Sequence, residues 1–246
     1  MNVYAMEKAI DEELSAKVLL VSLGLSGLYL IIGYKWFYSF IFGSILDSWA
    51  FTFVWPIYRY MIVFALLFLI PWYIWRKIWK QKLRSIGWQW GNRKWGLILS
   101  IIGAFAIIGI GFSTAADPSF AMVYPYERVF VDPAYGQFNV WGFLVFEAMY
   151  VVLYYIPYEF FFRGFLQFPN PDKNRSKILT VLLSTTITTI IHWDAPNTEL
   201  FAALAVGFVY GFVALGTKSI FYGLINHIAV GLTTNIVCVL ILQGVI

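Results

Sequence analysis

The sequence is poor in charged side chains and has a single cysteine. Only 12% of its 246 residues are charged and 61% are hydrophobic, whereas a soluble domain usually carries about 25% charged residues. So apolar a chain cannot cover its surface with polar groups in water, which excludes an ordinary soluble globular protein. The one thiol, Cys238, gives no disulfide framework. We expect it to be a small buried apolar group.

Long apolar runs take up most of the chain, and a helix needs about 20 mainly apolar residues to cross a bilayer. The sequence therefore predicts an all-α, polytopic membrane helix bundle with about seven transmembrane helices. The predicted spans are 18–33, 57–75, 96–112, 141–168, 178–192, 200–215 and 220–242. We expect a short amphipathic helix in 1–17 and an interfacial or re-entrant stretch in 34–56. We divide the remainder into N-terminal spans with a basic loop (18–94) and a core (95–246).

The basic residues cluster between the second and third predicted spans. Residues 76–94 contain seven Lys and Arg side chains and no acid, which predicts that this loop is cytoplasmic. The loop 115–138, with Asp117, Glu127 and Asp132, then lies outside, and the C-terminus lies outside as well. Because the net charge of +4 follows the ends of the spans, it indicates orientation and no nucleic-acid partner. We expect an integral multi-pass protein of a prokaryotic plasma membrane, with the lipid bilayer around it.

Ionisable side chains inside the predicted spans are costly in hydrocarbon, so each one suggests a function. We single out Glu147, Glu159, Arg163, His192 and His227, and the two histidines are the only ones in the chain. Glu159 and Arg163 are four residues apart, share a helix face and can pair. At 1.5 Å per residue, Glu159 and His227 lie about 13 and 12 Å from the cytoplasmic helix ends, and His192 about 21 Å. Three helices can thus direct these groups into one cavity, while Glu147 is expected to be structural.

Such a set of side chains has three possible uses. A carboxylate and a histidine can activate a water that attacks a carbonyl, while the second histidine stabilises the oxyanion. Two histidines and a carboxylate can also hold a catalytic zinc ion, although the sequence has no His-Glu-x-x-His motif. A proton relay in a transporter is the third use. We expect no cofactor, with zinc as the alternative.

The run from Tyr158 to Gly164, YEFFFRG, resembles the first motif of the CAAX protease and bacteriocin-processing family (CPBP, type II CAAX prenyl endopeptidase), written EExxxR. His192 matches the histidine of the family's second motif, and His227 matches that of the third. The segment Leu83-Arg84-Ser85-Ile86-Gly87 is similar to the family's lead-in before the third span. The resemblance extends from about residue 80 to the end and implies an intramembrane endopeptidase core in 95–246. In the family, a glutamate and the second histidine activate water, and the third histidine and an Asn form the oxyanion hole.

This chain departs from the family pattern at three positions. Tyr158 replaces the first Glu, Thr188 replaces the Phe of the second motif, and Gly231 replaces the Asn that follows the third histidine. The first departure matters most, because the family's water-activating carboxylate is assigned to that first Glu. Asn235, two helical turns after His227, is a possible substitute for the missing amide.

We predict an intramembrane endopeptidase that hydrolyses peptide bonds of membrane-associated or CAAX-like peptide or protein substrates. Glu159 is predicted as the base, His192 as its partner in holding water, His227 as the oxyanion donor and Arg163 as the group that orients Glu159. Tyr158 is expected at the edge of the cavity, where its hydroxyl can bond the water or the substrate. The alternative is a catalytically impaired member that acts as a bacteriocin-immunity or membrane scaffold protein.

Overall fold

The computed structural model describes residues 3–43, 48–126, 128–169, 174–193 and 195–246. These residues form an all-α fold that is 83% helix, with no strand in the described ranges. The all-α prediction is therefore confirmed.

The helices follow one another through short connections. They are α1 (Val3–Ile32), α2 (Lys35–Phe42), α3 (Ser48–Phe64), η2 (Ala65–Leu69), α4 (Ile70–Tyr73), η3 (Ile74–Ile78), η4 (Leu83–Ile86), α5 (Arg93–Ala116), α6 (Pro118–Val123), α7 (Arg128–Val131), η5 (Pro133–Tyr135), α8 (Val140–Tyr150), η6 (Val151–Tyr155), α9 (Ile156–Glu159), η7 (Phe160–Phe165), α10 (Asn174–Ile191), α11 (Asn197–Thr217) and α12 (Phe221–Leu242). The segments α3 to η3 form one long helix, and α8 to η7 form a second.

Among the described residues, five helices are long and apolar enough to cross a membrane: Glu13–Ile32, Phe53–Ile78, Val140–Phe165, Asn197–Thr217 and Phe221–Leu242. The predicted count of seven spans is not confirmed. The predicted span 178–192 is helical but short, because its apolar part is Lys177–Ile191. The predicted span 96–112 forms α5, which is not among the five. The predicted N-terminal helix is continuous with the first span in α1.

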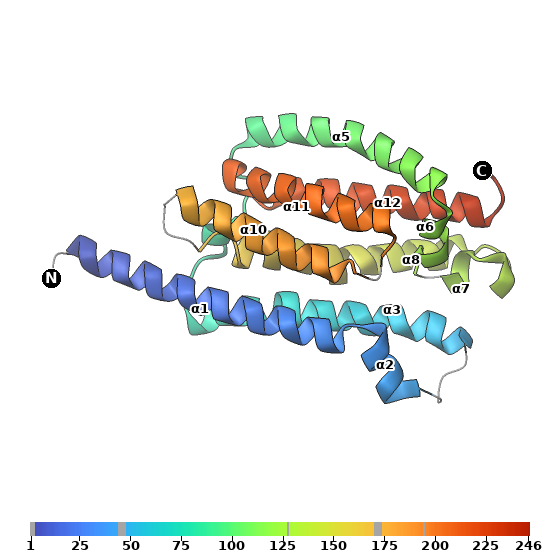
Figure 1. The fold of residues 1–246 in the computed structure, drawn as a ribbon, viewed down its shortest axis with the longest axis horizontal. Coiled ribbons are helices and arrows are strands. Elements are labelled where there is room, and N and C mark those ends of the chain that lie inside the picture. The colour runs from blue at the N-terminus through green and yellow to red at the C-terminus, as the bar shows by residue number, and fades with distance from the viewer. Residues whose placement is uncertain (1–2, 44–47, 127, 170–173, 194) are drawn as a thin grey trace.

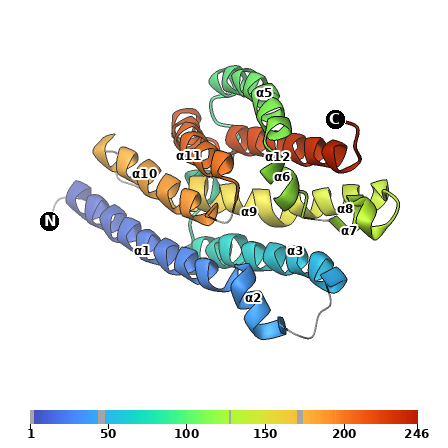
Figure 2. The same ribbon diagram turned by 45° about the vertical axis from the view of Figure 1, so that its right-hand side comes forward.

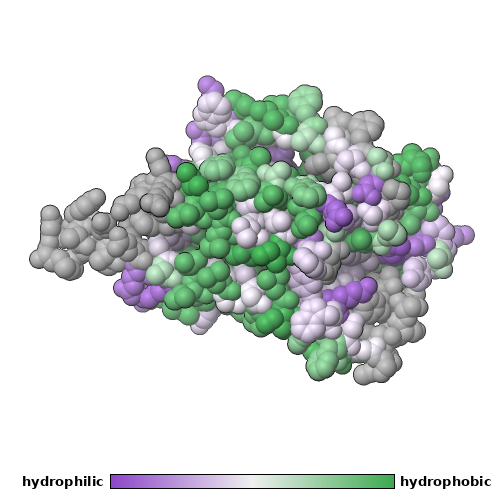
Figure 3. Space-filling view, viewed as in Figure 1, coloured by the Kyte–Doolittle hydropathy of each residue, from purple (hydrophilic) through white to green (hydrophobic). Residues whose placement is uncertain are grey.

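The helix from α8 to η7 lies in the middle of the molecule (Figure 1). Helices α1 and α3 cover one side of it, and α10, α11 and α12 cover the other, with α5 outermost against α12; Figure 2 shows the same order after a turn. The buried face of η7 explains this position, because Phe160, Phe161, Phe162 and Phe165 are all 0% exposed. Large hydrophobic side chains such as Phe105 and Trp141 are exposed, and Figure 3 shows apolar side chains across much of one face. This surface suits contact with lipid.

The two long helices share an unusual backbone pattern around a proline. Pro71 lies in α4 between the π-helical segments η2 and η3, and Pro157 lies in α9 between η6 and η7. Proline has no N–H to donate, and local π adjustments help a membrane helix to bond the carbonyls that it leaves free. Just before Pro157, the N–H of Ile156 bonds the carbonyl of Val151, five residues earlier, which is the π-helical pattern.

The basic segment before α5 holds the start of α12. The N–H of Ile220 donates to the carbonyl of Gly87 at 3.0 Å, and the N–H of Asn92 donates to the carbonyl of Thr217 at 2.7 Å. Gly87 has φ +77° and a Cβ there would meet Phe168, so the position requires glycine. These bonds fix the end of the helix that carries His227.

Candidate active site

A cavity of about 560 Å³ lies inside the bundle, among side chains that come from most of its long helices. It extends from Glu159 and Arg163 in the middle of the bundle to Phe120, Tyr124 and Tyr126 at the end where α6 and α7 lie. The starts of α5 and α10 lie at the other end (Figure 1). The predicted site residues Tyr158, Glu159, Arg163, His192, His227 and Asn235 all line this cavity.

Glu159 is paired with His227 and not with His192. Its Oε1 lies 2.8 Å from Nδ1 of His227, which indicates that Nδ1 donates its proton to the carboxylate. The Glu159 side chain is 0% exposed, whereas that of His227 is 20% exposed. The carboxylate of this pair is therefore buried, whereas the imidazole lies at the cavity wall. Its Nε2 is not bonded to Glu159.

Arg163 completes this buried group. Its Nε lies 3.7 Å from Oε2 of Glu159, so the predicted ion pair along the helix is present. Its Nη1 donates to the hydroxyl of Ser184 on α10 at 2.6 Å, and that hydroxyl donates to the carbonyl of Phe162 at 3.0 Å. Opposite charge and hydrogen bonds together reduce the cost of burying both ions, and they fasten the motif helix to α10.

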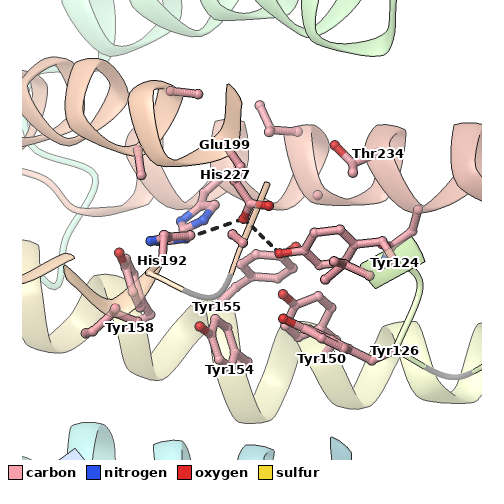
Figure 4. A pocket seen from close by; sticks show the side chains of 18 of the residues that line it. Tyr124, Tyr126, Tyr150, Tyr154, Tyr155, Tyr158, His192, Glu199, His227 and Thr234 are labelled. Carbon is pink, nitrogen blue, oxygen red and sulfur yellow. Dashed lines mark hydrogen bonds and ion pairs between the residues drawn. The ribbon is translucent and has the colours of Figure 1, made fainter. Parts of the chain in front are cut away.

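His192 lies directly after the last residue of α10 and faces a different acid. Its Nδ1 is 2.7 Å from the carbonyl of Thr188, and a carbonyl can only accept, so Nδ1 carries the proton. The Nε2 is thus left as an acceptor, 3.7 Å from Oε1 of Glu199. Figure 4 shows Glu199 between His192 and Tyr124. Tyr124 donates to the same Oε1 at 2.7 Å, and its burial and the nearby carboxylate raise the pKa of its hydroxyl well above the ordinary value.

Sequence reasoning missed Glu199, because the residue was assigned to an outer loop before a span at 200–215. The structure starts α11 three residues earlier, at Asn197, and places Glu199 in its first turn. An acid near a helix N-terminus is favoured by the helix dipole. Its distance of only seven residues from His192 was the available signal.

Tyrosine rings surround both histidines. The ring of Tyr158 lies 5.3 Å from that of His227 and 6.3 Å from that of His192, centroid to centroid. Tyr155 is 4.8 Å from His227. Tyr158 is 2% exposed, so it lies in the wall of the cavity and contacts both imidazoles.

Gly231 stands where the family has an Asn, and Asn235 was the possible substitute for it. Neither position places a free amide beside His227. A Cβ at Gly231 would collide with the hydroxyl of Tyr155, so the tyrosine fills the space where the family carries an amide side chain. Asn235 is 2% exposed and donates from Nδ2 to Oε1 of Glu147. This bond engages Asn235 with a second buried acid, 4% exposed, on α8.

A partly buried cation that sequence reasoning also missed lies nearer the α6–α7 end of the cavity. Arg59, on α3, donates to the hydroxyl of Tyr126 at 2.7 Å and to that of Tyr29 at 3.3 Å. Its guanidinium also lies over the rings of Tyr126 and Tyr154. Within the described part of the chain, Arg59 forms no ion pair with a carboxylate. Its position inside the predicted span 57–75 was the available signal, because a charged side chain within a span suggests a function.

The residues present do not fit a zinc site. In the ranges that the structure describes, no group of three or more His, Cys, Asp or Glu side chains is placed to hold a metal ion. Oε1 of Glu159 is 2.8 Å from Nδ1 of His227, whereas His192 faces Glu199. Glu159 and the two histidines are therefore not gathered around one point as three ligands.

Comparison with known proteins agrees with the motifs. Residues 137–233 match the family model described as type II CAAX prenyl endopeptidase Rce1-like. This confirms the resemblance to the CAAX protease family, and the matched segment includes Glu159, Arg163, His192, Glu199 and His227. No curated protein and no solved structure matches the chain. The family and the apolar helices together support an integral multi-pass membrane protein.

Proposed function

Because residues 137–233 carry the CAAX-protease segment, we propose that this chain is an intramembrane endopeptidase that hydrolyses peptide bonds of membrane-associated or CAAX-like substrates. The observation that carries the proposal is the placement of two imidazoles, each beside a carboxylate, in one cavity within an apolar bundle. A water and a substrate carbonyl can both reach this cavity wall. Acyl transfer to water needs an acceptor for the water proton and a donor for the oxyanion, which two histidines can supply.

The hydrogen bonds of the two rings suggest different roles. Nδ1 of His192 is used as a donor to Thr188, so its Nε2 can accept a hydrogen from water and hold it. Nδ1 of His227 is fixed by Glu159, so its Nε2, when protonated, can donate to the carbonyl oxygen as that oxygen becomes negative. Orientation of an imidazole by a buried carboxylate serves the same purpose in other hydrolases.

The enclosure of Glu159 bears on its predicted role as the base. A side chain that is 0% exposed and bonded to His227 is better placed to orient that imidazole than to touch a water. We therefore assign Glu159 to holding His227 and Arg163 to holding Glu159. The earlier prediction that Glu159 itself takes the proton remains untested.

Basic side chains indicate how a substrate lies in the cavity. Arg59 offers its guanidinium to the cavity without a carboxylate partner in the described part of the chain, and Lys35 and Arg128 line the same region. A guanidinium binds a carboxylate through charge-assisted hydrogen bonds. We therefore propose that the preferred substrate ends near the cleaved bond and places its free C-terminal carboxylate at Arg59.

The alternative is a family member that has kept the fold and lost the chemistry. Tyr158 favours it, because a phenol with an ordinary pKa of about 10 is a poor replacement for a carboxylate base. The experiment that decides is incubation of the detergent-purified protein with a peptide library, followed by mass spectrometry of the products. We expect cleavage near free C-termini by the wild type and none by His192→Ala. A folded wild type that cuts no peptide would favour the alternative.

A further inference from the structure

The cavity contains two carboxylates beside histidines, and they differ in access. Glu159 is 0% exposed and its Oε1 is bonded to His227, whereas the side chain of Glu199 is 19% exposed and borders the cavity. In the described part of the chain, the Oε2 atoms of both acids are buried and have no hydrogen-bond partner, so the difference in access lies in the side-chain exposure. Of the two acids, Glu199 is the one whose side chain is open to the cavity.

The distance between Glu199 and His192 suits a shared water. Their nearest atoms, Oε1 and Nε2, are 3.7 Å apart, which is longer than a direct hydrogen bond of about 2.7–3.2 Å. Separations of this kind are often bridged by water. Nε2 is an acceptor because Nδ1 of His192 holds the ring proton, so a water beside both groups can donate one hydrogen to each.

Other side chains hold Glu199 in place. Tyr124, which is 7% exposed, donates to Oε1 at 2.7 Å. The neighbouring Thr198 donates to Asp117, at the N-cap of α6, at 2.6 Å. The start of α11 is thus fastened to the segment that lines this end of the cavity, and the carboxylate is oriented before a substrate arrives.

We propose that Glu199 is the catalytic base of this enzyme and supplies, from α11, the carboxylate that position 158 lacks. This proposal rests on the peptidase function proposed above. The carboxylate takes one proton from the water held by His192, and the water oxygen forms a bond to the carbonyl carbon while the carbonyl electron pair moves to its oxygen. When that oxyanion collapses, the C–N bond breaks and the protonated Glu199 returns its proton to the leaving amine. One water and one peptide bond thus give one acid and one amine.

The test is kcat for a peptide that the wild type cleaves, measured on the full chain in detergent with the variants Glu199→Gln and Glu13→Gln. A general base contributes about 10²–10⁴-fold, so Glu199→Gln is expected to lower kcat by at least about 100-fold. Glu13→Gln makes the same chemical change at an exposed site on α1 and is expected to leave kcat within about twofold of the wild type. Elution volume and thermal unfolding check that each variant is folded. If Glu199→Gln does not fold, Glu199→Asp is measured in its place, and the same fold-changes in kcat are expected.

A second variant separates chemistry from structural damage. Tyr158 lies against His192, so Tyr158→Glu in the Glu199→Gln chain returns a carboxylate to that histidine from the other side, and at least a tenfold gain in kcat is expected. A loss below tenfold in folded Glu199→Gln, or no gain in the double variant, overturns the proposal and leaves the peptidase function standing. A wild type and a Tyr158→Glu variant that both fold and cut nothing overturn both.

Discussion

Substitution of Glu159 by Gln tests whether the buried pair with His227 serves catalysis or only stability. The amide of Gln can still accept from Nδ1 of His227, so the hydrogen bond seen at 2.8 Å has a replacement. The negative charge has none, and Arg163, whose side chain is 3% exposed, remains buried without a counter-ion. Removing one partner of a buried pair costs about 3–5 kcal/mol. Because Arg163 keeps its bond to Ser184, we expect a loss of about 3 kcal/mol in the free energy of unfolding.

The double variant Glu159→Gln/Arg163→Met distinguishes the two roles. It removes both charges, and replacing a whole buried pair by apolar groups is often neutral, so stability is expected to return to within about 1 kcal/mol of the wild type. Activity is not expected to return, because His227 still lacks its anionic partner. For both variants we expect kcat to fall by about 10²–10⁴-fold. Denaturant unfolding in detergent and peptide cleavage are the two assays, and a double variant that regains both stability and activity would refute the assignment of Glu159 to His227.

Four other predictions concern the cavity and its surroundings. Gly231→Ala is expected to destabilise the protein by about 1–3 kcal/mol, because its Cβ meets the hydroxyl of Tyr155; a variant that unfolds at the wild-type temperature would contradict the packing. Arg59→Gln is expected to raise KM by about 10–100-fold for peptides with a free C-terminus, as loss of about 1.5–3 kcal/mol from a charged hydrogen bond predicts, and to leave amidated peptides unaffected; equal effects on both would disprove the carboxylate site. Exhaustive chelation is expected to leave cleavage unchanged, whereas loss of activity restored by zinc alone would assign the histidines to a metal. In a Cys238→Ala background, a cysteine placed at Gln81 is expected to be protected from an impermeant outside reagent, and a cysteine placed at Gln137 is expected to be labelled by it. The reverse pattern would invert the orientation.

The sequence predicted the helical class well, because apolar runs longer than the hydrocarbon thickness have few other folds in lipid. It predicted the positions of the spans better than their number. The apolar part of α10, Lys177–Ile191, is only 15 residues long, and a stretch of about that length also suits a helix buried in protein. The short helices α6 and α7 in the loop 115–138 were not predicted, since each is too brief to show a period.

For the site, helix depth was enough to bring Glu159, His192 and His227 to one cavity, yet it did not predict which of them would pair. Pairing depends on how each helix is rotated about its axis, and the π-helical segments beside Pro157 change that rotation in a way that an ideal period of 3.6 does not describe. Glu199 and Arg59 were missed for a different reason. One lies at a helix start and the other at the edge of a span, where charged residues are ordinarily solvated.

The π-helical segment η6 also affects how the gene for this chain can change. An i→i+5 turn takes up one residue more than an i→i+4 turn, so loss of a single codon within Val151–Tyr155 can leave a continuous α-helix. Because the wide turn already takes up the extra residue, the part of the helix before the deletion, including Glu147, would keep its direction relative to Glu159. The face of α8 that bonds Asn235 and the motif after Pro157 would both keep their partners. Loss of one residue within the α-helical part of α8 would instead turn Glu147 by about 100° relative to Glu159. The segment Val151–Tyr155 is therefore the place in this helix where descendants of this sequence can lose a residue without disturbing the cavity.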